Sequence, residues 1–159
     1  MGVPASSRLQ WTRVVVVLAS LTPCCLIPSL SFAHDQTLDD LKQRIASSGI
    51  AERASLCIQF SERQLDIANQ LYASGDGDKA QAALVDVAAF SEMARDYAIQ
   101  AHKHEKQSEI AIRKMARKLS DLKHAVAHDE QTQVQETINR LERVRDDLLT
   151  SMFPVGGKK

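Results

Sequence analysis

The chain of 159 residues has few of the residues that form turns, aromatic clusters or covalent cross-links. It contains six glycines, four prolines and three cysteines, and its aromatic residues are one tryptophan, two tyrosines and four phenylalanines. Because few of the glycines and prolines lie in the middle of the chain, there is little material for the tight turns of a β-sheet protein. The scarcity of rings also argues against a ligand pocket lined by aromatic side chains.

The sequence also lacks the short motifs of common catalytic sites. It has no Cys-x-x-Cys-His haem attachment, no glycine-rich phosphate loop and no Gly-x-Ser-x-Gly nucleophile elbow. Its adjacent carboxylates, such as Asp39-Asp40 and Asp146-Asp147, fall at predicted helix ends or on polar faces, where contact with water explains them. We therefore expect a protein that is not an enzyme and that carries no cofactor.

Residues 1–33 have the three-part pattern of a secretory signal peptide. Two arginines precede an apolar run over 14–21, and Ser31-Phe32-Ala33 places small residues before a cleavage site. The sequence therefore predicts a periplasmic or secreted protein whose mature chain begins at His34. Residues 34–153 would then form a single helical domain, and residues 154–159 a flexible tail.

Two other interpretations of the apolar segment stay open. Residues 14–33 are about long enough to span a bilayer, although Pro23 and Pro28 would weaken a spanning helix. Cleavage before Cys24 would give a lipoprotein instead, although Pro23 stands where that motif has a small residue.

The mature chain is nearly neutral and has one cysteine. Loss of residues 1–33 leaves 126 residues with 18 Lys and Arg against 20 Asp and Glu, which argues against nucleic acid as a partner. Cys57 lies among apolar residues and has no second cysteine to pair with inside the chain. We expect a buried, unreactive thiol, and an intermolecular disulfide is the alternative.

Apolar spacing predicts helices over most of the mature chain. A short helix is expected over 37–46, a second over 51–73 and a last one over 132–153. The second helix has two apolar stripes, of which the lesser consists of Ile58, Leu65 and Tyr72. A helix with two apolar stripes has two neighbours to cover.

The middle of the chain predicts one long helix over 78–128. An apolar heptad continues through it without a slip, and neither proline nor glycine interrupts it. Its positions are Ala80, Leu84, Val87, Ser91, Ala94, Ala98, Ala101, Glu105, Ser108, Ile112, Met115, Leu119, Leu122 and Val126. The stretch 102–109 is entirely polar, so a kink or hinge there is the alternative. We expect an all-α antiparallel bundle in which the long helix is flanked by the two shorter helices, with the short N-terminal helix beside them.

Opposite charges predict that the last helix folds back on the second half of the long one. Residues 103–123 carry seven Lys and Arg against three Asp and Glu, whereas residues 129–147 carry six Asp and Glu against three Arg. Because the acidic last helix would neutralise this basic stretch, little basic surface remains for binding a membrane or nucleic acid. Because one long helix with two flanking helices buries few faces, we expect a homodimer or a protein partner.

A local resemblance also indicates protein binding. The phrase Tyr72-Ala73-Ser74-Gly75-Asp76, followed by Lys79-Ala80, carries most of it, and Ala68 and Leu71 take small and apolar positions before the turn. With these residues, the stretch 61–94 resembles one tetratricopeptide-type helical hairpin, although the terminating proline and a second copy at a 34-residue period are absent. That family is a protein-binding scaffold, so the resemblance implies interaction.

The whole mature chain is also similar to small exported helical proteins of Gram-negative bacteria whose activity is not known. The similarity is concentrated in the run from Gln135 to Arg143 and in Asp146-Asp147-Leu148-Leu149. It implies export and a helical fold.

Histidines supply the candidates for a metal site. His124 and His128 are spaced i, i+4, so two imidazoles on one helix could share a metal, and Asp121 could be a third ligand. The heptad places Leu122 and Val126 inside the bundle, so these histidines would face solvent without the hydrogen-bond partners that orient metal ligands.

Two function hypotheses follow from these patterns. The first is a non-enzymatic exported helical protein that acts through protein–protein interaction or self-association. The second is a periplasmic metal-binding or metal-stress protein that uses surface histidines, for which His102 and His104 could also contribute if the helix unwinds between them.

Overall fold

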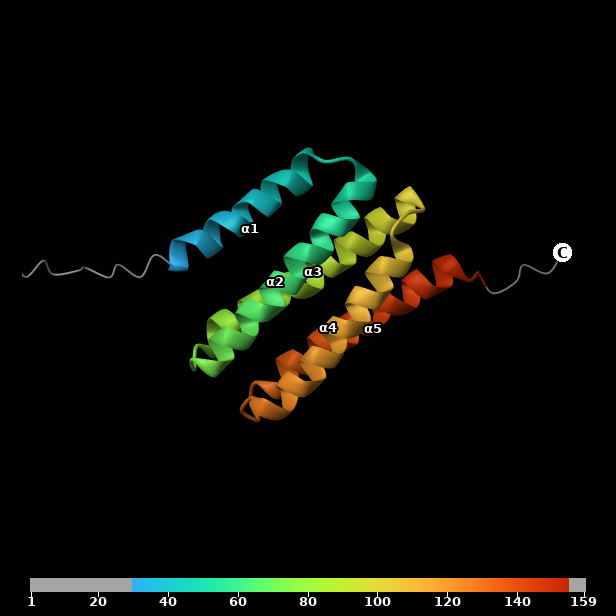
Figure 1. Cartoon of the computed structure of the whole chain (residues 1–159). Coiled ribbons are helices and arrows are strands. Elements are labelled where there is room, and N and C mark those ends of the chain that lie inside the picture. The colour runs from blue at the N-terminus through green and yellow to red at the C-terminus, as the bar shows by residue number, and fades with distance from the viewer. Residues whose placement is uncertain (1–29, 155–159) are drawn as a thin grey trace, which may run out of the picture.

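The computed structural model describes residues 30–154, with side chains described from Leu38 onward, and folds them into five helices (Figure 1). These are α1 (Leu30–Ser47), α2 (Ile50–Ala73), α3 (Gly77–Ala101), α4 (Glu105–Ala125) and α5 (Gln131–Met152). No strand is present in residues 30–154, so the predicted all-α fold is confirmed. Most of the predicted signal peptide and of the predicted tail lies outside the described residues.

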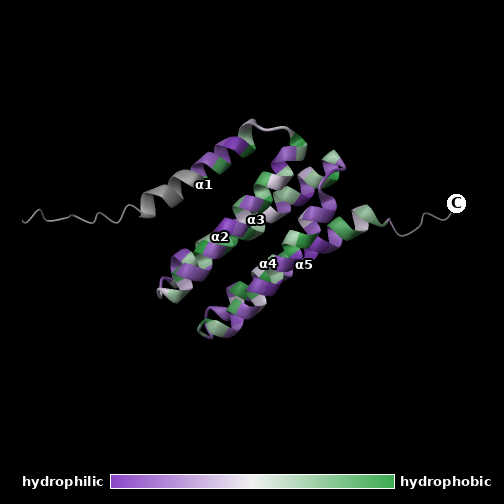
Figure 2. Ribbon diagram, in the orientation of Figure 1, coloured by the Kyte–Doolittle hydropathy of each residue, from purple (hydrophilic) through white to green (hydrophobic). Residues whose placement is uncertain are grey.

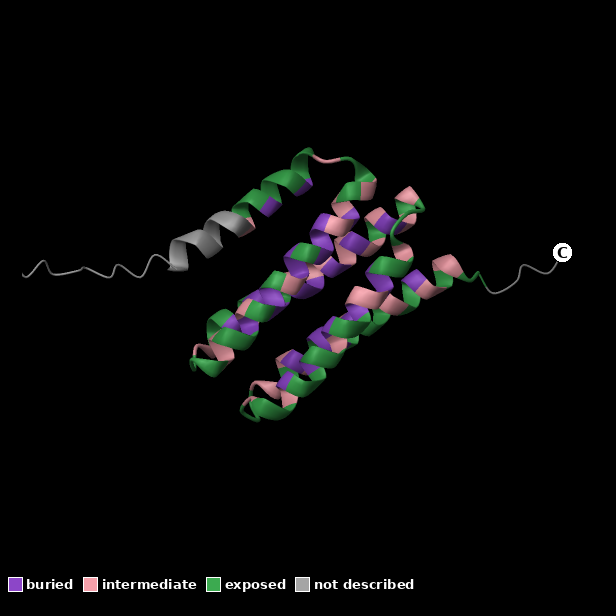
Figure 3. Ribbon diagram, viewed as in Figure 1, coloured by how far each residue is buried: buried purple, intermediate pink, exposed green. Residues whose placement is uncertain are grey.

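Helices α2–α5 form an antiparallel four-helix bundle made of two hairpins. The first hairpin consists of α2 and α3, and the second consists of α4 and α5. The hairpins meet through α3 against α5 and through α2 against α4, while α1 packs against α2 (Figure 1). Hydrophobic residues alternate with hydrophilic ones along each helix (Figure 2), and the buried ones follow the sides of α2–α5 that face each other (Figure 3).

Small residues allow α2 and α3 to lie close together. The buried alanines and serines of the two helices are Ala54, Ser61, Ala68, Ala80, Ala83, Ala88, Ser91, Ala94 and Ala98. The Ser91 hydroxyl donates a hydrogen bond to Ser61 Oγ at 3.2 Å, and Ser61 donates to the carbonyl oxygen of Val87 at 3.3 Å. These bonds satisfy two hydroxyl groups that would otherwise be buried without partners.

Larger side chains fill the second hairpin. Ile112, Met115 and Leu119 of α4 are almost completely buried, as are Leu141 and Leu148 of α5. Burial of one such side chain stabilises a fold by about 1.5–3 kcal/mol. Large side chains are buried in the first hairpin as well, where Phe60, Leu56 and Leu84 pack among the small residues.

The prediction of one continuous helix over 78–128 is wrong, and the alternative of a break in the polar stretch is confirmed. Helix α3 ends at Ala101 and α4 begins at Glu105. Between them, His102 and His104 have left-handed backbones with φ of 51° and 65°. We call residues 102–104 the joint.

The physical reason for the break lies in burial. All three side chains of the joint are exposed, so no core contact favours a straight helix there. Folding the chain back lets the apolar faces of α3 and α4 share one core instead. A left-handed backbone costs a non-glycine residue about 1–2 kcal/mol, and histidine adopts it more often than most residues do.

The heptad register continues across the joint even though the helix does not. Every heptad position from Ala80 to Ala98 and from Ser108 to Leu122 is buried. The sequence pattern therefore identified the buried face of both helices correctly, and only their continuity was predicted wrongly.

Helix α1 is longer than predicted, because it begins at Leu30 rather than near Thr37. No proline or glycine separates these two residues, so nothing in the backbone ends the helix there. At its other end, the Arg53 side chain closes the turn to α2 by donating hydrogen bonds to the carbonyl oxygens of Ser48 (2.8 Å) and Ala46 (3.0 Å).

The prediction that the last helix folds back on the second half of the long one is confirmed, because α5 packs against α4, but the charge pairing expected between them is wrong. Among the described residues, no Lys or Arg of α4 forms an ion pair with a carboxylate of α5. The ion pair between these helices has the opposite sense, because Glu109 of α4 accepts a hydrogen bond from Arg145 of α5 at 3.2 Å. A net charge summed along a segment does not say which face of the helix carries it.

Ion pairs instead connect the two hairpins. Arg140 of α5 donates two hydrogen bonds to Glu92 of α3 at 2.8 and 2.9 Å, a bidentate geometry that holds the pKa of Glu92 below its usual range. Arg95 of α3 contacts Asp147 of α5 at 2.7 Å, and Lys118 of α4 contacts Asp66 of α2 at 3.3 Å.

Two valines of α3 provide a test of this packing. Val87 is completely buried, whereas Val85, two residues away, is 48% exposed. We expect Val87→Ala to lower the free energy of unfolding by about 2 kcal/mol, since it removes two buried methyl groups and leaves a cavity. Val85→Ala is the matched control, with an expected change below about 0.5 kcal/mol in chemical denaturation. Equal effects of the two substitutions would contradict the assigned faces.

Candidate functional site

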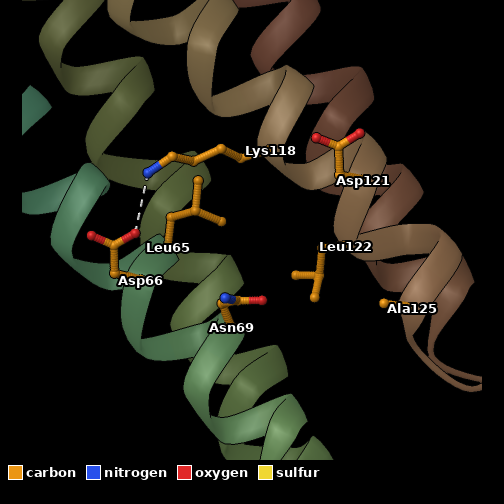
Figure 4. A pocket seen from close by; sticks show the side chains of 7 residues that line it. All are labelled: Leu65, Asp66, Asn69, Lys118, Asp121, Leu122 and Ala125. Carbon is orange, nitrogen blue, oxygen red and sulfur yellow. Dashed lines mark hydrogen bonds and ion pairs between the residues drawn. The ribbon is translucent and has the colours of Figure 1, made fainter.

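A groove opens between the two hairpins on the side where α2 lies against α4. It has a volume of about 390 Å³. Its lining residues are Leu65, Asp66, Asn69, Lys118, Asp121, Leu122 and Ala125 (Figure 4). In Figure 4, Leu65 and Asn69 of α2 face Leu122 of α4 across the opening. Both leucines belong to the hydrophobic core, so the floor of the groove is the core itself.

A second hollow extends the groove toward the tips of the hairpins. It also has a volume of about 390 Å³ and shares Asn69, Leu122 and Ala125 with the first. Its other lining residues are Tyr72, Ala73, Gly75, Val126, Ala127 and Glu130. We call the two hollows together the α2–α4 groove.

Two turns shape the closed end of the groove. Gly75 has a φ of 81°, a backbone that glycine adopts without strain, and it lets the chain reverse after α2. Helix α4 ends at Ala125, and Val126 takes an extended backbone with a φ of −87° and a ψ of 163°. The turns touch, because a Cβ atom on Gly77 would overlap the carboxylate of Glu130.

The rim of the groove is acidic. Asp66, Asp121 and Glu130 contribute carboxylates, and Lys118 is the cation among the lining residues. Lys118 reaches across the mouth to Asp66, and the two side chains are 61% and 62% exposed (Figure 4). An ion pair this exposed contributes only about 0–1 kcal/mol, so it can open when another charged group approaches.

Tyr72 brings an unpaired polar atom to the groove. Its hydroxyl group is buried and has no hydrogen-bond partner in the described part of the chain. Burial, and secondly the charge of Glu130, raise the pKa of Tyr72, so the group stays neutral and can donate a hydrogen bond.

The candidate metal ligands do not come together. Helix α4 ends at Ala125, so His124 is helical whereas His128 lies in the loop beyond, and the i, i+4 geometry of one helix is lost. Asp121 lines the α2–α4 groove, while His128 lines a different hollow with Lys123 and Gln135. No group of three potential ligands forms among the residues that the structure describes.

The other candidates are also placed by the structure. His102 and His104 lie in the joint, exposed and separated by Lys103. Cys57 is completely buried, as predicted, and burial raises the pKa of its thiol to about 11 against the opposing effect of Arg53. A thiol with so little thiolate at neutral pH is a poor nucleophile.

The groove and its lining residues were not predicted from the sequence, although one pattern in the sequence indicated their place. The lesser apolar stripe of α2 ends in Leu65 and Tyr72, which both line the groove. Helix α2 packs against three neighbours, α1, α3 and α4, one more than the two stripes indicated. The stripes could not show that a hollow would open beside Leu65 and Tyr72, between α2 and α4.

Comparison with known proteins gives no further indication of family. The chain matches no protein-family model, no curated protein and no solved structure. Among the described helices, none combines the length and the apolar character needed to cross a membrane.

The Tyr72 hydroxyl yields a stability prediction. We expect Tyr72→Phe to raise the free energy of unfolding by about 1 kcal/mol, because it removes a buried polar atom that has no partner in the described chain. Tyr97→Phe, on α3, is the matched control and should change the stability by less than about 0.5 kcal/mol. A loss of stability in Tyr72→Phe would show that the hydroxyl group is bonded in the free protein.

Proposed function

We propose that this protein is a non-enzymatic, exported helical bundle that binds an amphipathic helix of a partner protein in the α2–α4 groove. One observation carries the proposal: core leucines of both hairpins, Leu65 and Leu122, line an open hollow. Two helices with an apolar channel between them form the kind of surface on which an amphipathic helix lays its apolar face.

The charges on the rim favour a particular kind of helix. Three carboxylates and one lysine surround an apolar floor. A helix with an apolar stripe flanked by Lys or Arg would lay its stripe in the hollow above the leucines and place its cations beside Asp121 and Glu130. Such complementarity directs association and selects among partners more than it adds affinity.

The sequence supports the same class of function independently. The pattern of residues 1–33 favours export, and the resemblance of residues 61–94 to a tetratricopeptide-type hairpin favours protein binding. The absence of catalytic motifs from the sequence is compatible with a binding role. No observation on the described residues favours the metal-binding hypothesis over this one.

Site-specific crosslinking in cells that express the full-length chain tests the proposal. A photoreactive amino acid is placed at Asn69, inside the groove, or at Gln100, which is exposed on α3 outside it. We expect the envelope fraction to yield a discrete partner adduct from position 69 and none from position 100. Equal adducts from both positions would contradict the groove as the binding site.

Two substitutions of alanine by arginine then test direct binding. Ala125→Arg fills the groove from α4, and Ala82→Arg makes the same change on an exposed site of α3. A synthetic helix that covers the crosslinked segment should bind the purified Ala125→Arg protein at least about tenfold more weakly than the Ala82→Arg protein. Equal affinities would refute the proposed site.

A further inference from the structure

The residues of the joint make only short-range contacts of their own in the described structure. Its backbone hydrogen bonds run from Lys103 to Ala98 and from His102 to Ile99, both at 3.2 Å. Its side-chain contact is the 3.9 Å approach of His102 Nδ1 to Glu105. The His102 side chain is 86% exposed, so the joint itself has no contact with the core, and the packing of the two hairpins on each other maintains the bend.

The residues of the joint are compatible with a straight helix. No proline or glycine occurs from Asp78 to His128, and the left-handed backbones of His102 and His104 are unfavourable for side-chain-bearing residues. The heptad register of α3 continues into α4. A straightened joint would therefore give one helix whose apolar face runs along a single side.

Straightening would separate the hairpins without disturbing either of them. The packing of α2 on α3 lies within the first hairpin, and the packing of α4 on α5 lies within the second. The faces that would be uncovered are those where α3 meets α5 and where α2 and α3 meet α4. Each of these faces is complementary to the opposite hairpin, including that of a second copy.

The ion pairs between hairpins would be re-formed in the same way. Glu92 with Arg140, Arg95 with Asp147 and Asp66 with Lys118 each join one hairpin to the other. The pair of Glu109 with Arg145 lies within the second hairpin. The first three would be intermolecular in an exchanged dimer, whereas the last would stay within one chain.

We propose that two copies of this chain exchange their α4–α5 hairpins by straightening the joint, which gives a symmetric dimer with two complete four-helix bundles. The second copy is the partner that covers the uncovered faces, because the same residues already form that interface within one chain. The inference rests on the joint and the register. It goes beyond the groove proposal and does not depend on it.

Charge reversal provides a direct test, because Glu92 and Arg140 lie on different hairpins. Chains with Glu92→Arg and chains with Arg140→Glu each place like charges together in a closed monomer or in an exchanged homodimer. In an exchanged heterodimer, position 92 of each chain meets position 140 of the other with opposite charge. We expect the two full-length variants, unfolded together and refolded, to form a one-to-one dimer by light scattering and native mass spectrometry.

The pair within one hairpin is the matched control. Glu109→Arg and Arg145→Glu chains, mixed in the same way, should form heterodimers no more often than random pairing gives. These two positions belong to one chain in either state. Monomers after refolding of the Glu92 and Arg140 variants would overturn the proposal. A random mixture of homodimers and heterodimers would overturn it as well.

Substitutions in the joint test the hinge separately. His102→Gly with His104→Gly removes the disadvantage of the left-handed backbone, whereas His102→Ala with His104→Ala increases it and favours a helix. We expect the alanine protein to dimerise at least about tenfold more tightly than the glycine protein. Equal dimerisation would overturn the joint as the hinge, while crosslinking in the groove would remain a separate test of the proposed function.

Discussion

Coverage of one apolar stripe is the constraint on which this structure depends. The stripe runs from Ala80 to Leu122, and a straight helix would leave much of it in water. Bending at the joint lets the two halves share one core with α2 and α5. Burial of each large side chain contributes about 1.5–3 kcal/mol, so a few of them outweigh the left-handed backbones of His102 and His104, at about 1–2 kcal/mol each.

The packing of the two hairpins leaves an opening on one side of the bundle. Alanines and serines are frequent on the buried faces of α2 and α3, where Phe60, Leu56 and Leu84 are buried as well. The hairpins pack extensively through α3 and α5, whereas a hollow remains between α2 and α4. The groove thus follows from core packing, and its acidic rim and the Tyr72 hydroxyl give it chemical character.

Patterns with a fixed period predicted the fold well, and features that depend on contacts between distant segments were not predictable. The heptad identified the buried faces of α3 and α4, and glycine marked the turn after α2 correctly. The register permits a straight or a bent joint, so the choice between them depends on the packing of the hairpins. For the same reason, His124 and His128 were assigned to one helix that in fact ends at Ala125. Net charge suggested that cations of α4 pair with carboxylates of α5, whereas the ion pair that forms joins Glu109 of α4 to Arg145 of α5.

Backbone chemical shifts of residues 98–108, measured by NMR on the monomeric protein, test the central claim most directly. These shifts report φ and ψ for each residue, independently of side-chain packing. The account predicts helical values up to Ala101, left-handed values at His102 and His104, and helical values again from Glu105. Uninterrupted helical values in the monomer would contradict it, because the two halves of the stripe could not then cover each other within one chain.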